Sequence, residues 1–144
     1  MTAKVSDVLN LKGPQVVTVN PEMRIDTVAE ILTRNRIGAV PVIDSRRHLI
    51  GIISERDIIH GISRLGPAVL SQPVDALMTR EVTTCNLDDP IVELMEIMTH
   101  RRIRHLPVVE ADALCGIVSI GDVVKQRLSE AQFELEQLRQ YVSQ

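Results

Sequence analysis

The sequence GIISERD at residues 51–57 returns as GIVSIGD at residues 116–122, and this duplicated stretch decides the fold. In both copies an apolar run that begins with glycine leads to a serine, and an aspartate follows three residues later. Short apolar runs favour buried strands, and Ser-x-x-Asp is typical of the first turn of a helix. Each copy therefore predicts a strand that passes directly into a helix.

The similarity between the two halves extends outward from these stretches. Residues 16–42 fall on residues 82–108 at a shift of 66, whereas the two quoted stretches are 65 residues apart. The one-residue difference lies between Asp44 and Leu49, in a polar stretch that predicts a hairpin loop, where insertions are tolerated. A register kept through several successive elements predicts two copies of one structural unit.

Each copy predicts the order β-α-β-β-α, which is an α/β fold of tandem, pseudo-symmetric repeats. Apolar residues recur at helical spacing within residues 25–35 and 90–100, which predicts the first helix of each copy. Strands are expected at residues 16–19, 39–43 and 49–53 in the first copy and at 82–85, 106–109 and 114–118 in the second. Because the strands are nearly all apolar, both faces of each sheet should be covered.

The two copies are expected to pack against each other. A unit of about 45 residues buries too little surface to be stable alone, so a pseudo-twofold pair is the expected arrangement. The first repeat, with an N-terminal arm, is placed within residues 1–64, and the second, with an extended C-terminal helix, within residues 65–144. Residues 60–75 contain Gly and Pro and are expected to link them.

Composition excludes several classes of function. The 144 residues carry a net charge of −3, so the chain has no basic surface for nucleic acid. The only aromatic residues, Phe133 and Tyr141, lie outside the repeats, which argues against base stacking. No apolar run is long enough to span a membrane, and the N-terminus lacks the apolar segment of a signal peptide. The expected location is the cytoplasm.

No metal site and no disulfide are expected from the cysteines and histidines. Cys85 and Cys115 do not form a CxxC motif, and each stands where the other copy has an aliphatic strand residue. Small buried hydrophobic side chains are therefore the favoured interpretation. His100 and His105 flank the expected end of a helix, so their side chains need not converge on a zinc ion.

The Ser-x-x-Asp elements have two interpretations. In the structural one, Ser54 with Asp57 and Ser119 with Asp122 are capping boxes that stabilise helix starts. In the functional one, each aspartate accepts hydrogen bonds from the two vicinal hydroxyls of a ribose, and the serine hydroxyl adds a third polar contact. The sequence leaves both interpretations open.

A basic cluster in the second copy is a candidate phosphate site. Arg102, Arg104 and His105 lie at the start of a predicted strand, and arginine binds phosphate through two parallel hydrogen bonds. The first copy has Gly38 and Ala39 in place of Arg104 and His105, so it lacks these donors. The alternative for the two arginines is a solvated helix end that the helix dipole favours.

Together these motifs resemble a pair of CBS domains, the cystathionine β-synthase-type repeat, which form a Bateman module. The resemblance is carried by residues 16–19, 36–44 and 51–57 in the first copy and by residues 78–83, 102–110 and 116–122 in the second. It extends over roughly residues 5 to 127, which leaves no room for a fused enzyme, channel or transporter. It implies a stand-alone CBS pair of the bacterial type.

The resemblance also implies a ligand. Such pairs bind adenosine-containing molecules such as AMP, ADP, ATP, S-adenosylmethionine or NAD in clefts between the repeats. One expected cleft combines Ser54 and Asp57 at the ribose with Met78, Thr79, Arg80 and Val82 around the adenine, and Arg104, His105 and Arg102 toward the phosphate. The other combines Ser119 and Asp122 with Pro14, Gln15, Val16, Gly38 and Ala39. The Asp57 cleft is expected to be the main site, since it has more phosphate donors.

The function that the resemblance implies is non-catalytic: a regulatory module that senses a nucleotide and acts on an unidentified partner. Two alternatives stay open, a small enzyme that acts on a nucleotide and a purely structural dimerisation protein. The sequence contains no P-loop and no evident set of nucleophile, base and orienting residue, which argues against the enzyme.

The C-terminal region predicts a long helix that starts near Ser119 and runs nearly to the end of the chain. Its apolar residues are spaced 4, 3, 4, 3 and 4 apart, which is the pattern of a coiled-coil seam. These seam residues are Val124, Leu128, Ala131, Leu135, Leu138 and Val142. The pattern predicts a homodimer in which this helix and the faces of the CBS repeats contact the second subunit. The alternative is a helix that folds back on its own domain.

Overall fold

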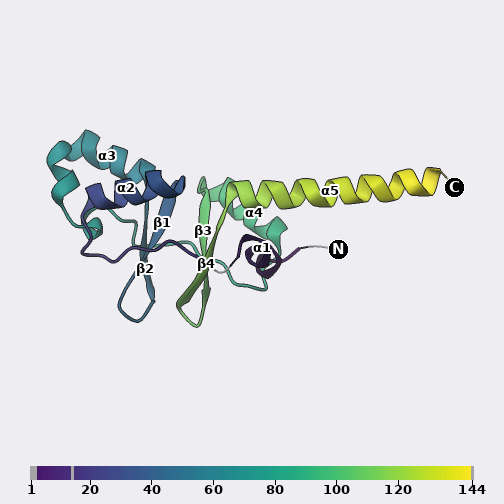
Figure 1. The fold of residues 1–144 in the computed structure, drawn as a ribbon, viewed down its shortest axis with the longest axis horizontal. Coiled ribbons are helices and arrows are strands. Elements are labelled where there is room, and N and C mark those ends of the chain that lie inside the picture. Colours follow the sequence, from purple (N-terminus) through teal and green to yellow (C-terminus); the bar gives the residue numbers. More distant parts are fainter. Residues whose placement is uncertain (1–2, 14, 144) are drawn as a thin grey trace.

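The computed structural model describes residues 3–13 and 15–143, and it consists of two similar halves and a protruding helix (Figure 1). The first half contains α2 (Ile25–Asn35), the hairpin β1 (Ala39–Ile43) and β2 (Leu49–Ser54), and α3 (Glu55–Leu65). The second contains α4 (Ile91–Arg101), the hairpin β3 (His105–Glu110) and β4 (Ala113–Ser119), and α5 (Ile120–Val142). The remaining elements are α1 (Val5–Lys12) and the short 3-10 helices η1 (Pro67–Ser71) and η2 (Val74–Ala76).

The tandem-repeat fold is confirmed, and α2, α4, α5 and the two hairpins lie where the sequence predicts them, whereas α1 was not predicted. Both hairpins are antiparallel, and their registers are interrupted at the same point, after Val42 in β1 and after Val108 in β3. The second strand of each hairpin passes directly into a helix, as the duplicated stretch predicts. No helix among residues 3–13 and 15–143 combines the length and apolar character needed to cross a membrane.

The strands predicted at residues 16–19 and 82–85 are wrong, because pairing there is limited to one residue in each copy. Val19 forms a parallel bridge with Val42, and Cys85 forms the equivalent bridge with Val108. A turn follows within two residues in both copies, so the chain crosses the edge of the hairpin instead of running along it. In the first copy Pro21 also lacks the N–H group that a longer ladder needs.

Each half has its own aliphatic core. In the first half, Ile25, Val28 and Leu32 of α2 are fully buried against the hairpin strands, with Val40, Val42 and Ile53 beneath them. In the second half the equivalent residues are Ile91, Leu94 and Met98 of α4, with Leu106, Val108 and Val118. The helical spacing of the apolar residues thus specified the buried face of both helices.

The N-terminal helix α1 closes the core of the second half, not of the first. Val5 and Val8 are buried there beside Leu94. The Val5 N–H donates to the Asp89 carbonyl at 2.9 Å, which fixes the start of α1 beside α4. Residues 3–12, which belong to the segment expected to hold the first repeat and its arm, therefore pack on the second.

The segment that connects the two halves packs on the first half, just as the N-terminal helix packs on the second. Val74 and Met78 are buried in the core of the first half, and the Val74 N–H donates to the Met23 carbonyl at 2.8 Å. Residues 60–75 were expected to be a linker, but they form the end of α3, η1 and the start of η2, all packed on the first half. They pack there because the side chains of Val69 and Val74 are buried in the core of the first half.

Two glycines permit these exchanges. A Cβ atom at Gly51 would lie 2.6 Å from Sδ of Met78, and one at Gly116 would lie 2.9 Å from Cδ2 of Leu9. Because both distances are below van der Waals contact, a larger residue at either position would force the side chain of the exchanged segment to shift. The two contacts are equivalent, so Leu9 of the N-terminal helix corresponds to Met78 of the central segment.

Candidate functional site

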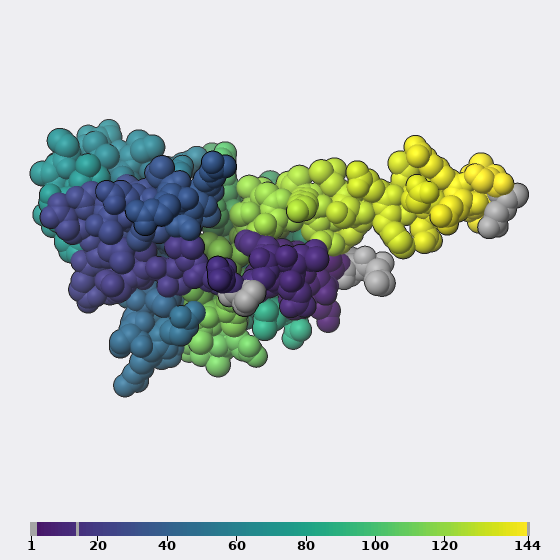
Figure 2. Space-filling model, viewed as in Figure 1, coloured from purple at the N-terminus to yellow at the C-terminus, as the bar shows by residue number. Residues whose placement is uncertain are grey.

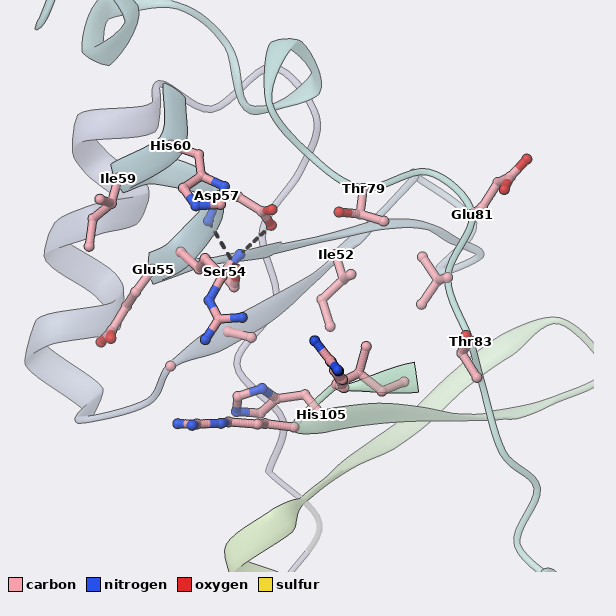
Figure 3. A pocket seen from close by; sticks show the side chains of 17 residues that line it. Ile52, Ser54, Glu55, Asp57, Ile59, His60, Thr79, Glu81, Thr83 and His105 are labelled. Atoms are coloured by element: carbon pink, nitrogen blue, oxygen red, sulfur yellow. Dashed lines mark hydrogen bonds between the residues drawn. The ribbon is translucent and has the colours of Figure 1, made fainter. Parts of the chain in front are cut away.

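A pocket of about 640 Å³ lies between the two halves, within the size range of small-molecule sites (Figure 3). The first half contributes the end of β2 and the first turns of α3, and the second contributes the start of β3. The extended segment 79–83 forms a further wall. The pocket thus lies where the duplicated Ser-x-x-Asp stretch of the first copy faces the basic cluster of the second.

Ser54 and Asp57 form a complete capping box at the start of α3. The Asp57 N–H donates to Ser54 Oγ at 3.1 Å, and the Ser54 N–H donates to Asp57 Oδ2 at 2.9 Å. Among residues 3–13 and 15–143, no group donates a hydrogen bond to the other carboxylate oxygen, Oδ1. Figure 3 shows the carboxylate directed toward Thr79 across the pocket. The capping role is therefore real, and it leaves one oxygen of Asp57 available to a ligand.

The wall formed by residues 79–83 is held in place by β2. Thr79 and Ile52 form an antiparallel bridge, in which the Ile52 N–H donates to the Thr79 carbonyl at 3.0 Å and the Thr79 N–H donates to the Ile52 carbonyl at 2.8 Å. Ile52, Val82 and Ile103 give the pocket its apolar surface. A flat heterocycle can pack between these aliphatic side chains next to an extended backbone.

The opposite side of the pocket is basic. Arg102 ends α4 in the left-handed conformation, with φ of 55°, and the chain then enters β3 through Arg104 and His105. Arg56 and His60 of α3 add a guanidinium and an imidazole from the first half. All five side chains line the pocket, and the three guanidinium groups can neutralise a phosphorylated ligand.

His105 lies at the contact between the halves. Burial lowers the pKa of its imidazole, and the positive charge of Lys12 lowers it further. The ring lies against Gly38, where a Cβ atom would be 3.3 Å from its Cε1. The imidazole is therefore neutral near pH 7 in the unliganded protein, and an anion bound beside it would favour its protonated form.

The structure brings most of the expected site residues into one pocket. These are Ser54, Asp57, Thr79, Val82, Arg102, Arg104, His105, Gly38 and Ala39. Two residues expected near the adenine lie elsewhere. Met78 is buried beneath Gly51 as part of the core, and the Arg80 guanidinium turns away to the Asp75 carbonyl at 3.2 Å.

The placement of Gly38 and Ala39 corrects the sequence-based expectation, which assigned them to the Asp122 cleft. They line the Asp57 pocket, because the Gly38 carbonyl accepts a hydrogen bond of 3.0 Å from the Glu55 N–H at the start of α3. This bond ties the end of α2 to the capped turn. Gly38 therefore lies next to the His105 ring at the contact between the halves.

The expected cleft around Asp122 has a different structure. Ser119 and Asp122 form the same capping box, with hydrogen bonds of 3.2 Å and 2.9 Å, but the Lys12 ammonium also donates to Asp122 Oδ2 at 2.7 Å. Burial by itself raises the pKa of the Asp122 carboxyl, but the hydrogen bonds from Lys12 and from the Ser119 N–H outweigh it, so the pKa lies below its usual value. Gln15 is exposed and Val16 half-buried, and neither lines the Asp57 pocket, whereas Pro14 lies outside the described residues.

Several residues that line the pocket were not predicted from the sequence, although their spacing along the chain could have indicated them. Arg56, Ile59 and His60 recur at helical spacing on α3, and Glu81 and Thr83 alternate with the expected Thr79 along an extended segment. These periodicities place each set on one side of its element. Glu55, Ile52 and Ile103 complete the lining.

The described part of the chain contains no cluster of three or more His, Cys, Asp or Glu side chains that could hold a metal ion. Cys85 is buried in the second core, and burial raises the pKa of its thiol to about 12. Cys115 is half-buried on β4.

Comparison with known proteins assigns the repeats. The CBS domain matches residues 5–64 and, a second time, residues 74–129. The chain is 32% identical to the mitochondrial CBS domain-containing protein CBSX3 of Arabidopsis thaliana, over 96% of this chain and 71% of that protein. It is 45% identical to the CBS-domain containing protein ATU1752 from Agrobacterium tumefaciens, whose crystal structure superposes with a TM-score of 0.83 over 87% of this chain and 99% of the other.

Similar structures with bound ligands are known. The CBS domain pair of protein MJ0100, in complex with 5′-methylthioadenosine and S-adenosyl-L-methionine, is 25% identical and superposes with a TM-score of 0.80. The match covers 90% of this chain and 99% of that one.

Proposed function

Because the chain belongs to the CBS-domain family and carries two copies of the domain, we propose that it is a regulatory module that binds an adenine nucleotide in the Asp57 pocket. One observation carries the proposal: the pocket sets an uncommitted carboxylate oxygen opposite a cluster of arginine and histidine side chains. A carboxylate suits the ribose hydroxyls and the cationic cluster suits the phosphate. Nucleotide binding would then be relayed to a regulated partner protein.

The ligand is oriented by the chemistry of the three walls. The ribose hydroxyls donate to Asp57, with the Ser54 hydroxyl nearby. The adenine lies between Ile52 and Val82, where the backbone of residues 79–83 borders the pocket. The phosphates extend toward Arg104 and His105 in the second half.

The basic side of the pocket favours AMP, ADP or ATP over S-adenosylmethionine. Three guanidinium groups line the pocket and can form paired hydrogen bonds with phosphate oxygens, which S-adenosylmethionine lacks, although the carboxylates of Glu55, Asp57 and Glu81 line the pocket too. The methylthioadenosine and S-adenosylmethionine bound to the similar CBS pair share the adenosine part of the proposed ligand. S-adenosylmethionine and NAD therefore belong in the same binding experiment as competing ligands.

The proposal is tested by titration calorimetry of the purified chain with AMP, ADP, ATP, NAD, S-adenosylmethionine and adenosine. We expect at least one adenine nucleotide to bind with one molecule per chain, and adenosine to bind at least about tenfold more weakly, because it lacks charge-assisted hydrogen bonds worth about 1.5–3 kcal/mol each. The nucleotide should be recovered unchanged after prolonged incubation. Turnover would support the enzyme alternative, and the absence of binding at millimolar nucleotide would support a purely structural role.

We further propose that the chain forms a homodimer through the faces of its CBS repeats and through α5. The outer part of α5 extends away from the body of its own chain (Figure 2). Leu128, Leu135 and Leu138 are each at least half exposed along its seam, and Val124 and Leu128 line a shallow groove on its first turns. An exposed heptad seam on a protruding helix is covered when the same helix of a second copy packs on it.

The dimer proposal predicts that ending the chain after Arg127 halves the mass measured by light scattering. The truncated chain keeps both cores, since the core residue of α5 is Val123. Leu135→Glu should have the same effect, because it places a charge in the seam. Gln137→Glu, on the same helix but off the seam, is the matched control and should leave the mass unchanged. An unchanged mass for both seam variants would remove α5 from the interface.

A further inference from the structure

The two halves differ where the exchanged segments end. After Met78 the chain is extended, and Thr79 bridges Ile52 at the edge of the Asp57 pocket. After Leu9, which corresponds to Met78, the chain continues as helix α1 to Lys12. The second half therefore has a helical turn where the first half has the extended wall of its pocket.

Lys12 projects from this last turn into the expected second cleft. Its ammonium donates to the Ile117 carbonyl at 2.9 Å and to Asp122 Oδ2 at 2.7 Å. Ile117 corresponds to Ile52 in the repeat, and in the first half the Ile52 carbonyl accepts its hydrogen bond from the Thr79 N–H. Lys12 thus donates to Ile117 the kind of hydrogen bond that a backbone N–H donates to Ile52 in the first half. It also binds the Asp122 carboxylate.

We propose that Lys12 is an internal occupant of the Asp122 cleft and that it restricts each chain to one nucleotide, bound at Asp57. Asp122 Oδ2 already accepts from Lys12 and from the Ser119 N–H. The ion pair is partly shielded from water, with side-chain exposures of 37% for Lys12 and 21% for Asp122. Neutral ribose hydroxyls would have to displace a charged donor from this carboxylate, which is unfavourable.

The equivalent segment of the first half is shorter and carries no lysine. Six residues, 10–15, separate Leu9 from Val16, whereas only three, 79–81, separate Met78 from Val82, so Lys12 lies in a segment that the first half does not reproduce. The shorter segment brings Glu81 to the lining of the Asp57 pocket. A glutamate cannot pair with Asp57, so that carboxylate stays available.

The inference rests on the proposed nucleotide binding, and its test measures stoichiometry. Titration calorimetry with the tightest-binding adenine nucleotide should give one site per chain for the wild type and two for Lys12→Met. Lys4→Met removes the same charge from the start of α1 and is the matched control, and Lys12→Arg keeps the charge, so both should retain one site. Adding Asp122→Asn to Lys12→Met should return the number to one. Two sites in the wild type, or one in Lys12→Met, would overturn the proposal.

A second measurement tests the internal contact without any ligand. The pKa of the Asp122 carboxyl, followed by carbon-detected NMR, should rise in Lys12→Met and stay unchanged in Lys4→Met. An unchanged Asp122 pKa in Lys12→Met would overturn the role of Lys12, whatever the calorimetry shows. If the wild type bound no nucleotide while the Asp122 pKa still rose in Lys12→Met, the proposed function would fail and the internal ion pair would stand.

Discussion

A chain that lacks residues 1–13 should be destabilised by about 4–7 kcal/mol, because Val5, Val8 and Leu9 leave the second core. Burying one such side chain completely contributes about 1.5–3 kcal/mol, and small domains are stable by only about 5–15 kcal/mol in total. We therefore expect the shortened chain to be largely unfolded or to unfold at a much lower urea concentration. Urea unfolding followed by far-ultraviolet circular dichroism measures the difference.

The matched control for this deletion is Leu11→Ser. Leu11 lies on the same helix but is 82% exposed, so its substitution should change the free energy of unfolding by no more than about 0.5 kcal/mol. Hydrogen exchange adds a regional readout: amides of α4 and of the β3–β4 hairpin should lose more protection than those of α2. An unchanged urea midpoint for the deletion would mean that α1 contributes little to the core.

Asp57→Asn should weaken nucleotide binding at least about tenfold. The substitution removes the charge that accepts the ribose hydroxyls, and hydrogen bonds to a charged group contribute about 1.5–3 kcal/mol each. An asparagine oxygen can still accept the Ser54 N–H, which Asp57 holds at 2.9 Å, so the helix cap is largely kept. Titration calorimetry on the folded variant gives the change in Kd.

A 2′-deoxynucleotide distinguishes a loss of ribose recognition from a loss of fold stability. It should bind the wild type more weakly than the ribonucleotide does, but it should bind Asp57→Asn about equally, because the variant no longer recognises the hydroxyl pair. Asp122→Asn makes the same chemical change in the equivalent capping box, where the carboxylate is paired with Lys12, and it should leave affinity unaltered. Wild-type affinity in Asp57→Asn would reduce the Ser-x-x-Asp element to a helix cap.

The local features of this protein were determined by its sequence. Helix α2 and the two hairpins follow from apolar spacing, and the capping boxes of α3 and α5 follow from serine and aspartate three residues apart. In each case the interacting groups are close neighbours along the chain or repeat with a simple period, so the sequence pattern alone carries the geometry. The duplication of the pattern was enough to predict the paired repeat.

Only the tertiary structure decided which segments complete which core and which cleft stays open. The exchange of α1 onto the second half depends on close contacts at Gly116 that no sequence periodicity encodes. Lys12 and Asp122 are 110 residues apart, yet their side chains meet at 2.7 Å. Such contacts arise when whole helices and strands pack together. A helical turn is specified by residues that are close in the sequence, but the packing of distant elements is not.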